Sequence, residues 1–199
     1  MALLAGARVD RQDDHGTIVA PRATLKVEPW QGGTLRGSFG TGFRIVNLFT
    51  EDHAALTGAR QVVIAEGLEP EESRSFAVNL NQIFEFGVNN MMIDVDLFHT
   101  RFTNRILPDY DTDPNRIIYA NLDGTSVSRG FALALNQNFG DTPFLYNAGI
   151  TIQDVYQESP GEGREAVPFA ADYTATWGAQ YTFRSVLDGL GVSYTGQRV

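Results

Sequence analysis

The segment at residues 170–183 alternates strictly between apolar and polar side chains. One set of alternate positions carries Tyr173, Ala175, Trp177, Ala179, Tyr181 and Phe183, and the other carries Asp172, Thr174, Thr176, Gly178, Gln180 and Thr182. A period of two residues places successive side chains on opposite faces of a β-strand. Because the second face is polar rather than a second hydrophobic layer, the segment is typical of a β-barrel wall with lipid outside and water inside.

Strands of this kind recur along the whole chain. They predict an all-β fold, an antiparallel meander of about nine long strands. The stretch 90–107 is long for a soluble protein, whose strands usually run about 5–6 residues. The predicted strands cover residues 3–10, 18–28, 34–44, 73–86, 90–107, 126–139, 144–156 and 170–183, and a last strand includes Leu190, Val192 and Tyr194.

The predicted connections alternate between short and long, as in transmembrane barrels. We expect short turns at Pro29–Gly33, Gly87–Asn90, Gly140–Pro143 and Ser185–Gly189, and long connections elsewhere, above all at residues 45–72. Aromatic residues border the short turns and predict one interfacial girdle. They are Trp30, Phe84, Phe86, Phe139, Phe144 and Phe183. The alternative is that these rings form the core of a soluble sheet.

Composition excludes several classes of protein. With 43% hydrophobic residues the chain is too apolar to be disordered, and without cysteine it has no disulfide or thiol chemistry. A net charge of −9 with no basic stripe argues against nucleic-acid binding. Residues 1–10 lack the charged start and apolar core of a secretion signal, which an outer-membrane protein needs. Either the barrel interpretation is wrong or the chain is an internal piece of a longer protein.

Four of the charged residues within the predicted strands are expected on one face. Asp94, Asp96, Arg36 and Arg101 are expected to point into the barrel lumen, where opposite charges could pair across neighbouring strands. Structural pairing is the expected role. For Thr50, Ser73 and the other hydroxyl residues no Ser–His–Asp type arrangement can be argued, so no catalytic residue is predicted.

Two loop clusters are candidates for ligand contact. Asp109, Asp111 and Asp113 have the spacing of a calcium loop, but Pro114 stands where that loop needs glycine and Ala120 where it needs glutamate. A solvated acidic loop is therefore expected, with no metal. The second cluster, Glu51, Asp52 and His53, lies in the long connection and has no second histidine or cysteine at metal-ligand spacing.

Several segments, taken in order, resemble the C-terminal half of the barrel in TonB-dependent outer-membrane receptors. They are residues 20–25 (APRATL), 34–44 (TLRGSFGTGFR), 47–51 (NLFTE), 68–73 (LEPEES), 98–106 (FHTRFTNRI), 119–124 (YANLDG) and 128–130 (SRG). The chain carries no segment resembling the plug domain, the TonB box or the terminal aromatic of a finished barrel. The resemblance therefore implies that residues 1–199 are part of a barrel domain of roughly 22 strands, with the plug domain absent.

The resemblance also implies a function. Such receptors sit in the Gram-negative outer membrane, in contact with its lipid, and import scarce ligands such as iron-siderophore complexes or cobalamin with energy from the TonB complex. That complex would act through the missing plug domain, and no cofactor is expected. Ligand contacts are expected in the loops that face the medium, first at residues 45–60 and then at 109–115. The candidate residues are Glu51, Asp52, His53, Asp109, Asp111 and Asp113.

Two other interpretations remain open from the sequence. One is a complete small outer-membrane barrel with a structural or adhesive role. The other is a soluble β-sandwich, either a carbohydrate-binding module or a lectin-like enzyme domain. An unclosed sheet has two bare edges, so the receptor interpretation predicts that the chain by itself aggregates in water.

Overall fold

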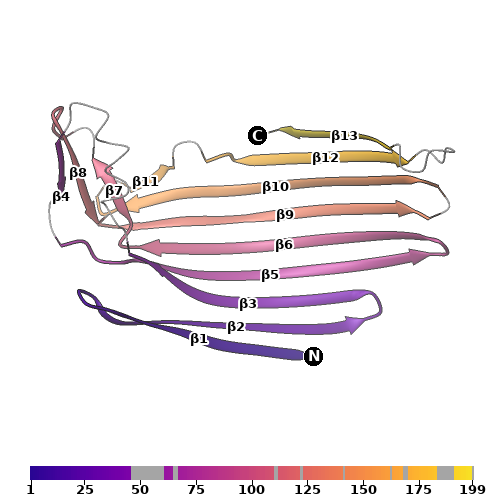
Figure 1. Cartoon of the computed structure of the whole chain (residues 1–199), viewed down its shortest axis with the longest axis horizontal. Coiled ribbons are helices and arrows are strands. Elements are labelled where there is room, and N and C mark those ends of the chain that lie inside the picture. The colour runs from indigo at the N-terminus through magenta and orange to yellow at the C-terminus, as the bar shows by residue number, and fades with distance from the viewer. Residues whose placement is uncertain are drawn as a thin grey trace.

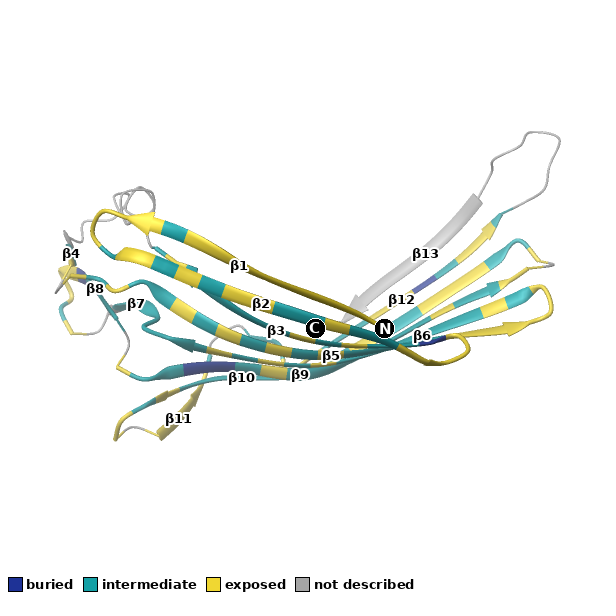
Figure 2. Ribbon diagram, turned by 90° about the horizontal axis from the view of Figure 1, so that it is seen from below, coloured by how far each residue is buried: buried dark blue, intermediate teal, exposed yellow. Residues whose placement is uncertain are grey.

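The computed structural model describes a broad sheet with a small second sheet at one end (Figure 1), and the view turned by 90° shows that the large sheet is curved (Figure 2). The large sheet runs in the order β1-β2-β3-β5-β6-β9-β10-β12-β13, with β11 paired to β10, and the small sheet in the order β4-β8-β7. The structure describes residues 1–45, 61–64, 67–109, 112–121, 123–140, 142–161, 163–167, 170–182 and 191–198. No helix among them is long and apolar enough to cross a membrane.

Every neighbouring pair of strands in the large sheet is antiparallel. Its edge strands, β1 and β13, are not paired with each other in the part of the chain described, so this sheet is open. The predicted all-β antiparallel meander is thus confirmed. The strands are β1 (Ala2–Gln12), β2 (Gly16–Trp30), β3 (Gly33–Arg44), β5 (Glu71–Phe86), β6 (Asn89–Thr103), β9 (Thr125–Phe139), β10 (Phe144–Ser159), β11 (Gly163–Ala166), β12 (Tyr173–Thr182) and β13 (Gly191–Arg198).

The predicted strand at residues 90–107 is interrupted. β6 ends at Thr103, and Asn104 adopts a positive φ of 53°, a left-handed conformation that asparagine tolerates better than most residues. The chain then enters the small sheet, which consists of β4 (Gln61–Ile64), β7 (Ile106–Asp109) and β8 (Arg116–Asn121). The pairing of β4 with β8 is parallel. This small sheet was not predicted from the sequence.

The small sheet has its own core. Ile117 and Tyr119 are buried, and Leu68 and Ile106 pack against them. Because Ile106 begins β7 and Leu68 immediately precedes the stretch that leads into β5, this core joins the small sheet to the rim of the large one. The small sheet therefore stands at the end of the large sheet where the long connections are (Figure 1).

Short turns lie at the opposite end of the large sheet, where they join β2 to β3, β5 to β6 and β9 to β10 (Figure 1). These positions were predicted, and the turn predicted at Ser185–Gly189 lies outside the described residues. Gly32 at one turn has a φ of 74°, and a Cβ there would lie 2.3 Å from the Ile83 carbonyl oxygen. The expectation of long connections everywhere else is wrong for β1 and β2, which residues 13–15 alone join at the other end.

The apolar face of the sheet is the more exposed face. In β5, Phe76 and Val78 are 57% and 45% exposed, whereas their polar neighbours Ser75 and Asn79 are half-buried. Figure 2 shows exposed and half-buried residues alternating along the strands of the curved sheet. No second layer of described residues covers the apolar side chains. A soluble sandwich buries that face, so the sandwich interpretation is wrong for this sheet.

The apolar side chains form continuous rows across the strands. One row is made of residues that are register partners in five neighbouring strands: Val78, Leu97, Phe131, Ile152 and Tyr173. The next row toward the short turns is Leu80, Val95, Leu133, Ile150 and Ala175. Cross-strand apolar pairs of this kind stabilise a sheet by roughly 0.2–1 kcal/mol each.

A hydrogen-bonded ladder runs along the polar face. Asn79 Nδ2 donates to Asp96 Oδ1 at 2.9 Å, and Asn81 Nδ2 donates to Asp94 Oδ1 at 2.7 Å. Arg36 Nη1 donates to Asn79 Oδ1 at 3.3 Å. The predicted common face of Arg36, Asp94 and Asp96 is confirmed, but asparagine amides rather than opposite charges hold the two carboxylates.

The prediction for Arg101 is wrong. Its position has the parity of Leu97, so it lies on the apolar face and its register partner in β5 is Arg74. Charge alone groups Arg101 with Asp94, Asp96 and Arg36, whereas its parity along β6 decides which face it lies on.

Aromatic side chains stand beside the short turns, as predicted. Phe84 and Phe86 are stacked with ring centroids 6.1 Å apart, and the rings of Phe139 and Phe144 are 5.6 Å apart. Trp30 is 54% exposed and its indole Nε1 donates to Gln82 Oε1. Phe183 lies outside the described residues. That these rings contact a membrane interface stays a prediction.

Candidate functional site at the strand-to-loop rim

Of the six predicted ligand-contact residues, the structure describes only Asp109 and Asp113. Glu51, Asp52, His53 and Asp111 lie outside the described residues. Asp109 is the last residue of β7. Asp113 serves its own turn: its Oδ1 accepts a hydrogen bond from the Asn115 amide at 2.8 Å, and its Oδ2 lies 3.4 Å from Arg116 Nε. Among the described residues, no three potential metal-ligating side chains converge.

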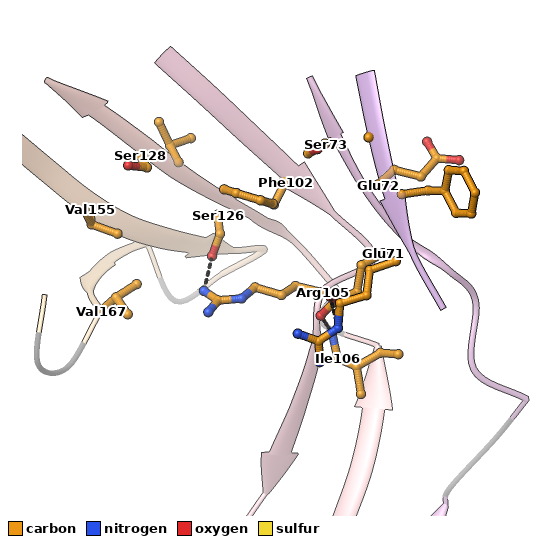
Figure 3. Close-up of a pocket in the computed structure, with 14 residues that line it drawn as sticks. Glu71, Glu72, Ser73, Phe102, Arg105, Ile106, Ser126, Ser128, Val155 and Val167 are labelled. Atoms are coloured by element: carbon orange, nitrogen blue, oxygen red, sulfur yellow. Dashed lines mark hydrogen bonds and ion pairs between the residues drawn. The ribbon is translucent and has the colours of Figure 1, made fainter. Parts of the chain in front are cut away.

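A cavity of about 490 Å³ lies where several strands of the large sheet reach the long connections (Figure 3). Its lining comes from the end of β3, the start of β5, the junction of β6 with β7, the start of β9 and the end of β10. These segments are distant in the sequence. The lining residues are Gly42, Phe43, Arg44, Glu71, Glu72, Ser73, Phe102, Arg105, Ile106, Ser126, Val127, Ser128, Val155 and Val167.

Arg105 and Glu71 make the polar contacts that organise this cavity. Arg105 Nη1 donates to Ser126 Oγ at 3.1 Å, and Ser126 is only 2% exposed (Figure 3). Glu71 Oε1 accepts a hydrogen bond from the Ile106 amide at 2.9 Å, and its Oε2 lies 3.4 Å from Arg44 Nε. Arg105 has no carboxylate partner among the described residues. Its planar guanidinium is thus available to an anionic group of a ligand.

A second set of hydrogen bonds fixes the small sheet to the rim. The Asn121 side chain accepts from the Glu69 amide at 2.8 Å and donates to the Glu69 carbonyl at 3.0 Å and the Asn104 carbonyl at 2.7 Å. Asn104 Nδ2 in turn donates to Glu69 Oε2 at 3.1 Å. We call these three residues the Asn121 junction. It ties together the segment before β5, the break after β6 and the end of β8.

Arg105 and Asn121 are not among the site residues predicted from the sequence. Both nevertheless lie in segments that carried the resemblance, residues 98–106 and 119–124, and Glu69 and Glu71 lie in a third, residues 68–73. The three segments converge at the rim. The polar residues Glu69, Asn104 and Asn121 within these segments were the signal that could have identified this junction.

A family model for the TonB dependent receptor-like β-barrel matches residues 2–199. The chain belongs to this family. TonB-dependent receptors are outer-membrane receptors and transporters of Gram-negative bacteria, not enzymes, and their barrel is the architecture seen here. The small sheet and the cavity therefore lie at the rim of a receptor barrel wall.

Solved receptor structures share the fold. The FrpB iron transporter from Neisseria meningitidis (F5-1 variant) has a TM-score of 0.70 and 17% identity, with 98% of this chain and 30% of that chain covered. The ferripyoverdine receptor of the outer membrane of Pseudomonas aeruginosa has a TM-score of 0.66 and 16% identity, with coverages of 98% and 25%. The Serratia marcescens hemophore receptor HasR, in complex with HasA and heme, has a TM-score of 0.60 and 14% identity, with coverages of 96% and 42%.

The chain spans less than half the length of these receptors. A search of curated proteins returned no match. The likeness to solved structures thus establishes the fold of a receptor barrel section.

Proposed function

We propose that this chain is a section of the barrel wall of an outer-membrane receptor that imports a scarce ligand such as an iron-siderophore complex or cobalamin. The observation that carries the proposal is the exposed apolar face on a sheet whose other face is a hydrogen-bonded polar ladder. An exposed apolar face is unfavourable in water. It is favourable when that face contacts a lipid bilayer and the polar face lines an aqueous lumen. Membership of the TonB-dependent receptor family supports import as the proposed activity.

The height of the apolar face agrees with a membrane wall. From Phe76 to Phe86, β5 rises roughly 33 Å along its own direction at about 3.3 Å per residue. A strand tilt of about 40° reduces this to a height of about 25 Å, the height of the apolar band of outer-membrane barrels. Phe76 and Phe86 are both more than half exposed, as a lipid contact requires.

The rim cavity is the proposed place for ligand contact in this section of the wall. Arg105 would bind an anionic group such as a carboxylate, with Ser126 orienting its guanidinium. The acidic and histidine candidates in the long connections, Glu51, Asp52 and His53, stay proposed contacts, as do Asp109, Asp111 and Asp113. Transport by the intact receptor would draw on the TonB complex through a plug domain.

Transport is tested by deleting the gene and following uptake. We expect the protein in the outer-membrane fraction, and its loss should reduce uptake of radiolabelled iron supplied as ferric siderophores, or of cyanocobalamin. Arg105→Gln should weaken uptake at limiting ligand while leaving the amount of assembled barrel unchanged. Arg11→Gln, at the end of β1 and outside the cavity lining, is the matched control. A protein found only in the soluble fraction would contradict the proposal.

A further inference from the structure

Two arginines face each other on the apolar side of the sheet. Arg74 in β5 and Arg101 in β6 are register partners, and both side chains are exposed. Side chains directly opposite in an antiparallel pair have Cβ atoms about 5 Å apart, and like charges in that position destabilise the sheet. Together with Thr103 they line a cavity of about 280 Å³. The arrangement costs stability unless an anion occupies the space between the two guanidinium groups.

Neither guanidinium has a carboxylate partner among the described residues. Asp154, on β10 two strands away from Arg101, is already engaged by two other arginines: Arg129 Nη2 lies 3.0 Å from its Oδ2, and Arg164 Nη2 contacts its Oδ1. Glu72 shares the face of Arg74 two residues toward the long connections, without an ion pair to it. The Arg74–Arg101 pair is therefore an uncompensated positive site in a chain whose net charge is −9.

This pair lies at the edge of the apolar face. The row containing Val78, Leu97 and Phe131 is wholly apolar, and the pair stands two rows closer to the long connections. In the proposed receptor, that height is where lipid acyl chains end and headgroups begin. A ligand bound between the arginines would have its polar part beside them and its apolar part along Val78 and Leu97.

We propose that Arg74 and Arg101 bind the phosphate group of an anionic lipid headgroup in the outer leaflet of the membrane. Two guanidinium groups around one phosphate match its oxygens bidentately and convert the mutual repulsion into attraction. The row next to the pair contains Phe76 together with His99 and Arg129, and the rows beyond it are apolar. Phe76 and those apolar rows favour a lipid over free phosphate, because acyl chains gain contact there. This inference rests on the proposed function, since it requires the apolar face to lie in a bilayer.

The test measures binding of fluorescent lipid A, a bisphosphorylated glycolipid, to the natural protein extracted in detergent. Arg74→Gln with Arg101→Gln should weaken binding at least about 10-fold. The affinity of the double variant Arg74→Lys with Arg101→Lys should lie between those of the natural protein and the double glutamine variant, because lysine keeps the charge but loses the bidentate geometry. Glu72→Gln should tighten binding by removing the nearest competing carboxylate. Arg36→Gln, on the polar face, is the control and should bind as the natural protein does.

Two competitors separate the sources of phosphate. Dephosphorylated lipid A should compete poorly, and millimolar inorganic phosphate should compete weakly. Unchanged affinity in the double glutamine variant, or displacement by inorganic phosphate as effective as by unlabelled lipid A, would overturn the inference. Heat-modifiable gel migration checks that each variant forms a barrel.

Ligand uptake is measured on the same variants, so the two proposals can fail separately. Normal uptake with lipid binding unaffected by the double variant rejects the arginine site alone. Lipid binding that depends on the pair, in a protein that supports no uptake, rejects the import function alone.

Discussion

The Asn121 junction predicts a local, measurable loss of stability. Asn121→Ala removes three hydrogen bonds, one to the Glu69 amide and one each to the Glu69 and Asn104 carbonyls. A hydrogen bond contributes about 0.5–1.5 kcal/mol net, and the lower part of that range applies here because water reaches the junction. The expected sum is about 2 kcal/mol, which corresponds to about 30-fold more frequent opening of the junction.

Hydrogen exchange measures that opening directly. The Glu69 amide of the natural protein in detergent should exchange about 30-fold faster in the variant, while amides in the middle of β5 and β6 keep their rates. Asn90→Ala is the matched control: Asn90 is exposed at the start of β6, and its side chain has no hydrogen bond among the described residues. It should change neither rate.

The isosteric variant Asn121→Asp distinguishes hydrogen bonding from space filling. It keeps an acceptor for the Glu69 amide but loses the amide donor and places a negative charge near two carbonyls and the Glu69 carboxylate. We therefore expect it to open at least as often as Asn121→Ala. Exchange at the natural rate in Asn121→Asp would show that shape alone holds the junction and would refute the reasoning.

Three further predictions concern the wall. Gly130→Ala should lower the stability of the barrel by about 1–3 kcal/mol, because a Cβ there would lie 2.6 Å from a backbone oxygen. Gly37→Ala is the control, because a Cβ at Gly37 meets open space. The temperature midpoint of heat-modifiable gel migration compares the two variants. Val78→Lys should cost about 1–2 kcal/mol of barrel stability, because Val78 lies between the middle of the apolar band and its edge, and it should reduce assembled barrel in outer membranes. Lysine at the neighbouring Ala77 faces the lumen, so Ala77→Lys should assemble. Residues 1–199 alone should elute as aggregates from size-exclusion chromatography without detergent, and a monodisperse β-rich monomer would contradict the membrane assignment.

The strands of the wall could be predicted from sequence because their signal is local. A period of two residues needs only one segment at a time, so residues 126–139 and 170–183 predict β9 and β12 to within a few residues. The resemblance then supplied the family, which the match over residues 2–199 confirms. The polar face of Asp94 and Asp96 follows from the same alternation.

The rim could not be predicted in the same way, because its contacts join segments far apart in the chain. The break at Asn104 depends on one left-handed residue, and alternation continues through it in the sequence. Asn121 meets Glu69 across 52 positions and Asn104 across 17. No spacing rule connects such residues, whereas runs of acids such as Asp109 to Asp113 are visible in the sequence. Within that run, the Asp113 carboxylate accepts a hydrogen bond from the Asn115 amide in its own turn.

Arg101 shows why charge alone is a poor guide to the faces of such a wall. In a soluble sheet a charged side chain belongs to the wet face, and that rule placed Arg101 in the lumen. The side chains of a membrane barrel wall differ in two ways. Alternate residues face the lumen or the membrane, and the membrane-facing residues change from apolar to polar where the hydrocarbon layer ends. Beyond that edge the outer face is wet as well, so Arg74, Arg101 and Arg129 lie on the same face as Leu97 but nearer the long connections. Whether a side chain in this sheet is polar therefore depends both on the face to which its alternate position assigns it and on its distance from the long connections. The alternation in the sequence reports only the face.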